Sequence, residues 1–255
     1  MSTKILVINA DDLGFSADIN STIEEGHRAG HITNATFMVD GKDVEGGLEV
    51  IRRNPRLGIG LHLDLCPVIG FYERTYQEIR ESLRSSEMQR RVADEVERQI
   101  RRFQGFGLEF THMDSHRHFH ALPEIFSVVV ETAAAHGLRT IRLTKDWILP
   151  KTPSVYWTDE FLSSATDLLR RLRVVFPDKF IYGANEYSAA TFDGSLNELM
   201  VHVAYQDAYF HREYLRVSGE ELWQGIQEAG IQVRSYRDVG VNGDAGRSNG
   251  RQGNE

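Results

Sequence analysis

Three clusters of carboxylate and imidazole side chains offer most of the chemistry that this sequence can perform. The first is Asn9-Ala10-Asp11-Asp12, directly after a short apolar run. Successive side chains that leave a strand point in different directions, so one carboxylate could bind a cation while the other stays free as a general base. The same pair could instead be an acidic helix start, which the helix dipole favours. This cluster alone leaves both interpretations open.

The second cluster lies in the alternating run Leu57–Leu65, where His62 falls on the side of the small residues. An imidazole on such a strand needs a partner, which could be a metal ion or a hydrogen-bonding group of the core. For a lone histidine the core interpretation is the ordinary one. His62 therefore becomes a candidate ligand only in combination with the other clusters.

The third cluster, His112–His120, holds four of the ten histidines. In extended backbone one face would carry Asp114, His116, His118 and His120. Crowded imidazoles repel when charged, so the pattern favours a divalent cation that holds one of them neutral while carboxylates orient the rest. A solvated histidine-rich loop is the alternative, and Asp114 in the same row argues against it. The spacing is not the H-E-x-x-H of zincins, and no G-x-S-x-G marks a serine nucleophile.

These clusters fall where apolar segments with the pattern of strands come to an end. The predicted strands span 4–9, 32–39, 57–65, 110–116, 138–143, 180–184, 196–203 and 231–236. Helical periodicity lies between them, for example in Val92, Val96, Ile100 and Phe103. Alternating strands and helices predict an α/β fold with a parallel sheet of seven or eight strands, closed or nearly closed into a barrel, with an open doubly wound sheet as the alternative. In both, the site lies at the carboxyl ends of the strands. The run Glu198–His202 ends one late apolar segment, where a general acid could face the site, although for the lone His202 a place in the core is the ordinary interpretation.

Size and composition limit the remaining possibilities. The chain has 255 residues, a net charge of -8 and one cysteine, so a nucleic-acid backbone is not the expected partner and no intrachain disulfide can form. No apolar run approaches the roughly 18 residues of a membrane helix, and the cytoplasm is the expected compartment. Residues 1–239 are predicted to form one domain, and the Gly- and Asn-rich residues 240–255 a disordered tail.

In combination, these motifs resemble the YdjC-like family of carbohydrate deacetylases, which includes chitooligosaccharide deacetylases and relatives from hopanoid biosynthesis. The matching stretches are NADDLGFSADIN at 9–20, GLHLDL at 60–65, THMDSHRHFHALPEIF at 111–126, the strand with Arg142, ELMVHVAY at 198–205 and IQVRSYRDV at 231–239. The resemblance implies a seven-stranded (β/α) barrel-like fold and a divalent cation, Mg²⁺ in most descriptions of the family and Zn²⁺ in the wider superfamily.

The resemblance also implies roles for individual residues. Asp12, His62 and His116 match the metal ligands, Asp11 the general base and His202 the late histidine expected to act as general acid. Val203 follows His202 where the family usually has proline, which leaves the placement of this loop open. The supporting residues would be Asp114, His118, His120 and Arg142, with Arg142 keeping Asp11 ionised by charge pairing.

The predicted function is therefore a metal-dependent hydrolase that removes N-acetyl groups from an amino sugar or short oligosaccharide. A cation would polarise the acyl carbonyl and acidify a coordinated water, Asp11 would accept the proton of that water, and His202 would protonate the leaving amine. The alternatives are a metal-dependent hydrolase of another sugar-linked bond and an inactive sugar-binding or metal-binding homologue. Exposed barrel ends are also compatible with a homodimer.

Overall fold

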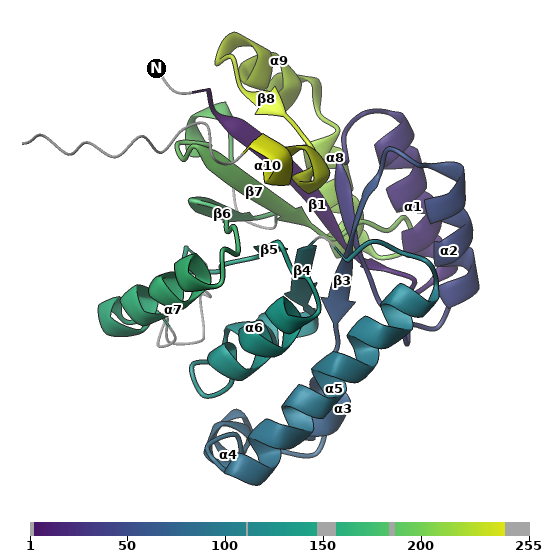
Figure 1. Ribbon diagram of the computed structural model, residues 1–255. Helices are drawn as coiled ribbons and strands as arrows, with labels where there is room; N and C mark the ends of the chain where they lie inside the picture. The colour runs from purple at the N-terminus through teal and green to yellow at the C-terminus, as the bar shows by residue number, and fades with distance from the viewer. Residues whose placement is uncertain (1–2, 111, 147–156, 184–186, 243–255) are drawn as a thin grey trace, which may run out of the picture.

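The centre of the protein is one parallel sheet (Figure 1). The computed structural model describes residues 3–110, 112–146, 157–183 and 187–242. Its strands are β1 (Ile5–Leu13), β2 (Asn34–Phe37), β3 (Gly58–Leu63), β4 (His112–Ser115), β5 (Thr140–Ile141), β6 (Lys179–Tyr182), β7 (Leu196–Val201) and β8 (Gln232–Val233). Every pairing between these strands is parallel, which confirms the predicted α/β class.

The order of the strands is that of a barrel opened at one place. Neighbouring strands run β5-β4-β3-β2-β1-β7-β6, and β8 pairs with the start of β1. The opening lies between β5 and β6, where Val175 exchanges backbone hydrogen bonds with Arg139 and Ile141 at 2.8 and 2.9 Å. In an open doubly wound sheet, β6 would precede β7 on the way outward from β1, whereas here β7 lies next to β1. The barrel-like prediction is confirmed, and the open-sheet alternative is wrong.

The helices lie around the sheet, most of them on its outer face, with the last helix at the amino ends of the strands (Figure 1). They are α1 (Ala17–Arg28), α2 (Val44–Arg53), α3 (Cys66–Ile69), α4 (Tyr76–Ser82), α5 (Ser86–Gly105), α6 (Phe126–Ala135), α7 (Asp159–Arg171), α8 (Ala208–Val217), α9 (Glu220–Glu228) and α10 (Tyr236–Asn242), with 3₁₀ turns η1 (His116–Ala121) and η2 (Ala189–Thr191). The amphipathic helix predicted around Val92 and Phe103 is α5, whose apolar side is buried. Among the described helices, none combines the length and the apolar character needed to cross a bilayer.

The two faces of β1 have different surroundings. Leu6 and Ile8 pack into the large apolar core beneath the helices. A separate inner cluster consists of Val7, Leu196, Tyr236 and Val239. Because side chains alternate along a strand, Asn9 and Asp11 continue the side of Val7. The inner side of the barrel thus changes from apolar at the start of β1 to polar at its carboxyl end, where the predicted site lies.

Helix α10 ends the described part of the chain. Because β8 pairs with Ile5 and Leu6 at the start of β1, α10 lies near the amino ends of the strands. The domain end predicted at residue 239 falls inside this helix, which continues to Asn242. Residues 243–255 of the predicted tail lie outside the described residues.

Candidate metal centre and catalytic site

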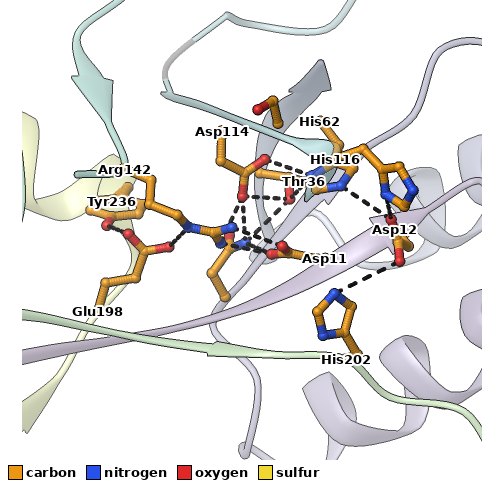
Figure 2. A network of polar contacts seen from close by, with 12 residues as sticks. Asp11, Asp12, Thr36, His62, Asp114, His116, Arg142, Glu198, His202 and Tyr236 are labelled. Atoms are coloured by element: carbon orange, nitrogen blue, oxygen red, sulfur yellow. Dashed lines mark hydrogen bonds and ion pairs between the residues drawn. The ribbon is translucent and has the colours of Figure 1, made fainter. Parts of the chain in front are cut away.

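Asp11 and Asp12 lie at the carboxyl end of β1, where the backbone becomes irregular. The register between β1 and β2 shifts just before Leu13, and Asp12 has a φ of 68°. Such left-handed backbone is uncommon outside glycine, although aspartate tolerates it better than most residues. Because alternation is broken at this bulge, both carboxylates can face the site, Asp11 toward Arg142 and Asp12 toward two histidines (Figure 2).

Asp12, His62 and His116 converge on one point. Asp12 Oδ1 lies 3.1 Å from His62 Nε2 and 3.2 Å from His116 Nδ1, and the three ligand atoms lie within 4.8 Å of one another. Atoms that each stand about 2.1 Å from a shared ion are roughly 3.0–3.4 Å apart at coordination angles of about 90–110°. Nε2 of His62 is buried and faces Asp12 Oδ1 without a well-formed hydrogen bond, an arrangement that a shared ion would complete. These three residues fit a divalent cation.

His62 is oriented by the residues behind it. His62 on β3 and Asp114 on β4 are register partners, so their side chains leave the sheet on the same side. His62 Nδ1 lies 2.6 Å from Asp114 Oδ1 and 3.2 Å from the hydroxyl of Thr36, which fixes the ring with Nε2 toward Asp12. Burial opposes a charge on His62, but Asp114 and Asp12 raise the pKa of His62 well above its ordinary value. A cation at Nε2 would therefore have to displace a proton.

Arg142 is buried among carboxylates. Its Nη1 and Nη2 each donate to Asp11 at 2.7 Å, its Nε donates to Glu198 at 2.7 Å, and Nη2 also lies 2.6 Å from Asp114. Burial alone would raise the pKa of Asp11, but the charge and hydrogen bonds of Arg142 hold it well below its ordinary value. Three carboxylates contact this guanidinium, and with Asp12 the site holds four carboxylates that are at most 5 % exposed. The excess negative charge is a second reason to expect a cation here.

The histidine-rich run is not extended throughout, and the prediction that its four alternate residues share one face is wrong. Strand β4 ends at Ser115 and η1 follows, with Arg117 and His118 both at a φ of 57°. Two successive left-handed residues turn the chain, because they reverse the direction of the backbone that an extended run would keep. His116 consequently faces Asp12, while the residues beyond it turn away.

His118 and His120 lie beyond the turn that follows Ser115, and neither belongs to a candidate metal group among the described residues. Nδ1 of His120 lies 2.6 Å from the Ser115 hydroxyl, and its Nε2 lies 3.0 Å from the backbone carbonyl of Arg142. The ring of His118 packs edge-on against Phe180. Burial lowers the pKa of His120 to about 3 and also lowers that of His118, so both rings are neutral at physiological pH. Both rings therefore add no charge to the site, and their supporting role stays a prediction.

His202 follows β7 and lies on the other side of Asp12 from His62 and His116 (Figure 2). Its Nε2 is 4.0 Å from Asp12 Oδ2. The imidazole stacks on Phe210 with ring centroids 4.9 Å apart, and its backbone N–H donates to the buried carboxylate of Glu213 at 2.8 Å. The side chain is 18 % exposed, so a substrate could reach it.

The loop that carries His202 is anchored without the usual proline. Val203 is buried, and the following backbone N–H groups of Tyr205 and Gln206 donate to the carboxylate of Asp18 at 3.1 and 2.9 Å. Asp18 belongs to the first turn of α1, so helix and loop are tied together. With these contacts in place, His202 faces Asp12.

Comparison with known proteins places this geometry in a family. The family model described as YdjC-like protein matches residues 5–228. The chain belongs to the YdjC-like family. A carbohydrate deacetylase of Brevibacillus brevis is 29 % identical to this YdjC-like protein, over 92 % of the chain and 99 % of the relative. A chitooligosaccharide deacetylase of an Enterobacter species is 32 % identical, again over 92 % and 99 %.

Solved structures share the fold of this YdjC-like protein. A protein of Enterococcus faecalis named for cellobiose-phosphate cleavage has a TM-score of 0.73 at 22 % identity, over 93 % of this chain and 99 % of its own. The lactam utilization protein of Thermus thermophilus has a TM-score of 0.54 at 16 % identity, over 92 % and 100 %. At such identities the likeness concerns the barrel-like architecture alone.

Several polar residues around the site of this YdjC-like protein were not assigned a role from the sequence. Glu198 contacts Arg142, Tyr236 contacts Glu198, and Thr36 contacts both His62 and Asp114. The sequence did offer one indication for Glu198, which is a single carboxylate within an apolar strand. A buried charge requires a partner, so a contact with a basic residue could have been predicted. Tyr236 and Thr36 carried no comparable signal, since their partners come from distant strands.

Proposed function

We propose that this YdjC-like protein is a metal-dependent hydrolase that removes N-acetyl groups from an amino sugar or short oligosaccharide. One observation carries the proposal: Asp12, His62 and His116 converge, with Asp11 and His202 beside them. Asp11 also falls in a second candidate group with His62 and Asp114, but both of its oxygens already accept hydrogen bonds from Arg142, which favours Asp12 as the ligand. Amide hydrolysis by this route needs a cation, a base and an acid around one reacting carbonyl. The relatives named as carbohydrate and chitooligosaccharide deacetylases supply the substrate class.

Asp12, His62 and His116 would hold the cation. Bound there, a divalent cation would act as a Lewis acid toward the acyl carbonyl and increase the acidity of water. Three protein ligands leave coordination positions free, as in other catalytic sites. Two imidazoles suit Zn²⁺ by donor chemistry, whereas the resemblance to the family implies Mg²⁺. Reloading the stripped protein with each ion separately distinguishes the two.

Asp11 is proposed as the general base. Its bidentate pairing with Arg142 keeps the carboxylate ionised at neutral pH, which is the protonation state that a base needs. Oδ1 of Asp11 also accepts from the Asn9 amide at 2.9 Å, so the acceptor capacity left for a proton lies on the second lone pair of Oδ2. Asp11 can take a proton from the attacking water as the carbonyl carbon is attacked.

His202 is proposed as the general acid that protonates the leaving amine. Phe210 and the Glu213 carboxylate restrict the plane and position of the ring, and Nε2 faces the metal ligands. An acid on the opposite side of Asp12 from His62 is well placed to reach a leaving group while water attacks from the other side. Loss of His202 should therefore impair breakdown of the tetrahedral intermediate more than substrate binding.

The decisive experiment is a screen of N-acetylated sugars with stripped and metal-reloaded protein, with acetate and free amine measured together. We expect equal amounts of both, and only with metal. Asp11→Asn should retain metal but lose about 10²–10⁴-fold in kcat, the usual contribution of a general base. Asp167→Asn, a surface aspartate with a side chain 66 % exposed, is the matched control and should keep full activity.

Each other outcome identifies an alternative. New reducing ends without acetate would indicate a glycosidase, which needs two carboxylates on either side of the bond. Sugar binding without turnover in any metal-loaded sample would indicate an inactive homologue. Full activity of Asp11→Asn would reject Asp11 as the base.

A further inference from the structure

A buried chain of hydrogen bonds leads from Arg142 away from the metal ligands (Figure 2). Arg142 Nε donates to Glu198 Oε1 at 2.7 Å, and the hydroxyl of Tyr236 donates to Glu198 Oε2 at 2.6 Å. Glu198 and Tyr236 are 1 % and 4 % exposed, so water does not replace these contacts. Both oxygens of Glu198 are thus occupied, one by the guanidinium and one by the phenol.

Tyr236 reaches this chain from the amino end of the barrel. It is the first residue of α10, and its ring packs into the inner apolar cluster with Val7 and Leu196. Its backbone N–H donates to Asn34 Oδ1 at 3.2 Å, and its ring lies 5.0 Å from that of His112. These contacts fix the tyrosine ring, so its hydroxyl points at Glu198 from a rigid position.

The guanidinium of Arg142 receives its orientation from two sides. Its Nη atoms face Asp11 and Asp114, whereas Nε faces Glu198. A planar fork held only at its Nη atoms can pivot about them, and a fixed acceptor at Nε removes that freedom. The direction in which Asp11 receives its two hydrogen bonds therefore depends on Glu198.

We infer that Tyr236 and Glu198 are positioning residues of the catalytic site, and that helix α10 completes this site from the opposite end of the barrel. The hydroxyl of Tyr236 orients Glu198, Glu198 orients the guanidinium of Arg142, and the guanidinium holds Asp11 where it can accept a proton. This inference rests on the proposed function, in which Asp11 is the base.

The charge of Glu198 depends on the same contacts. Burial raises the pKa of Glu198, while the charge of Arg142 and the hydrogen bond from Tyr236 both act against that rise. Without the hydroxyl, the protonated, neutral form of Glu198 becomes more populated. A neutral carboxyl is a weaker hydrogen-bond acceptor for a guanidinium than a carboxylate is. Removing one oxygen atom from Tyr236 should thus loosen Arg142, although the apolar packing of the ring is kept.

The test compares Tyr236→Phe with Tyr214→Phe. Tyr214 is also buried, but its hydroxyl contacts Glu25 at 3.4 Å in a different part of the protein. We expect Tyr236→Phe to lower kcat about tenfold, with KM and metal affinity changed less than about twofold, since positioning of a base affects the transition state rather than binding. Tyr214→Phe should leave all three unchanged. Glu198→Gln, which keeps the shape and loses the charge, should resemble Tyr236→Phe.

A second measurement does not require turnover. The Nε–H resonance of Arg142, assigned by its loss in Arg142→Lys, should exchange with solvent at least about tenfold faster in Tyr236→Phe than in wild type or Tyr214→Phe, because local opening exposes a less tightly held group. If wild type releases no acetate, the proposed function fails and this exchange rate still decides the inference. Unchanged exchange in Tyr236→Phe overturns it, as does an unchanged kcat in an active enzyme.

Discussion

Replacing Arg142 by methionine tests how strongly the buried carboxylates depend on one positive charge. The methionine fills much of the volume of the arginine, but it leaves Asp11, Asp114 and Glu198 without the guanidinium that each contacts at 2.6–2.7 Å. Breaking a buried ion pair by removing one partner costs about 3–5 kcal/mol. Because three carboxylates lose the same partner, we expect the upper end, about 5 kcal/mol of unfolding free energy, for metal-free protein at pH 8.

The loss should depend on pH, and its sign follows from the carboxyl groups. Without Arg142, burial raises their folded-state pKa values above those of the unfolded chain. A carboxyl with a raised folded pKa contributes stability below the unfolded pKa and loses that stability as pH rises through the folded pKa. The unfolding free energies of wild type and Arg142→Met should therefore differ by about 1–3 kcal/mol less at pH 5 than at pH 8. This estimate takes about 1.4 kcal/mol for each unit by which the folded-state pKa is raised.

Urea denaturation in the presence of a chelator, followed by near-ultraviolet circular dichroism at both pH values, measures these differences. Arg98→Met is the matched control, because Arg98 pairs with Glu95 on the surface and its side chain is 47 % exposed. The control should lose no more than about 1 kcal/mol at either pH. A loss for Arg142→Met as small as that of the control, or equally large at pH 8 and pH 5, would refute the electrostatic reasoning.

Three further predictions concern the metal, pH and packing. Chelation should lower the melting temperature, and metal at 100 times its Kd should restore about 2.7 kcal/mol in calorimetry, whereas His62→Ala should not respond. Burial lowers the pKa of His112 to about 3, so unfolding free energy should fall as pH drops from about 6.5 toward 3, and urea denaturation of His112→Leu should show a flatter profile. A methyl group at Gly60 would overlap the ring of His112, so Gly60→Ala should cost about 1–3 kcal/mol in thermal unfolding, while Gly105→Ala, which faces open space, should not destabilise.

The convergence of the three candidate ligands could be predicted, because each of them follows a predicted strand. Asp12, His62 and His116 are far apart in the sequence, yet each stands at the end of an apolar run with the pattern of a strand. In a parallel sheet the carboxyl ends of all strands gather on one side, so residue type and strand order together bring these residues close. The barrel-like arrangement was predictable for the same reason.

The orientation of the side chains could not be predicted, because it depends on breaks in the periodicity. Asp12 joins the ligands only through a bulge with a left-handed residue, and His116 separates from His118 and His120 only because the chain turns after Ser115. Alternation along an ideal strand predicts the opposite arrangement in both places. A strained backbone conformation persists only where tertiary contacts hold it in place. A single sequence does not reveal those contacts.

The position of Arg142 explains why the site tolerates so many carboxylates. Four of them in a buried space would take up protons if left alone, and a protonated Asp11 could not accept one from water. One guanidinium beside Asp11, Asp114 and Glu198 keeps Asp11 ionised without entering the ligand set. The remaining negative charge lies on the side of Asp12, where a divalent cation would bind. The same arrangement thus favours both a cation at Asp12 and an ionised Asp11, while Glu198 holds the arginine at Nε, on the side away from Asp12.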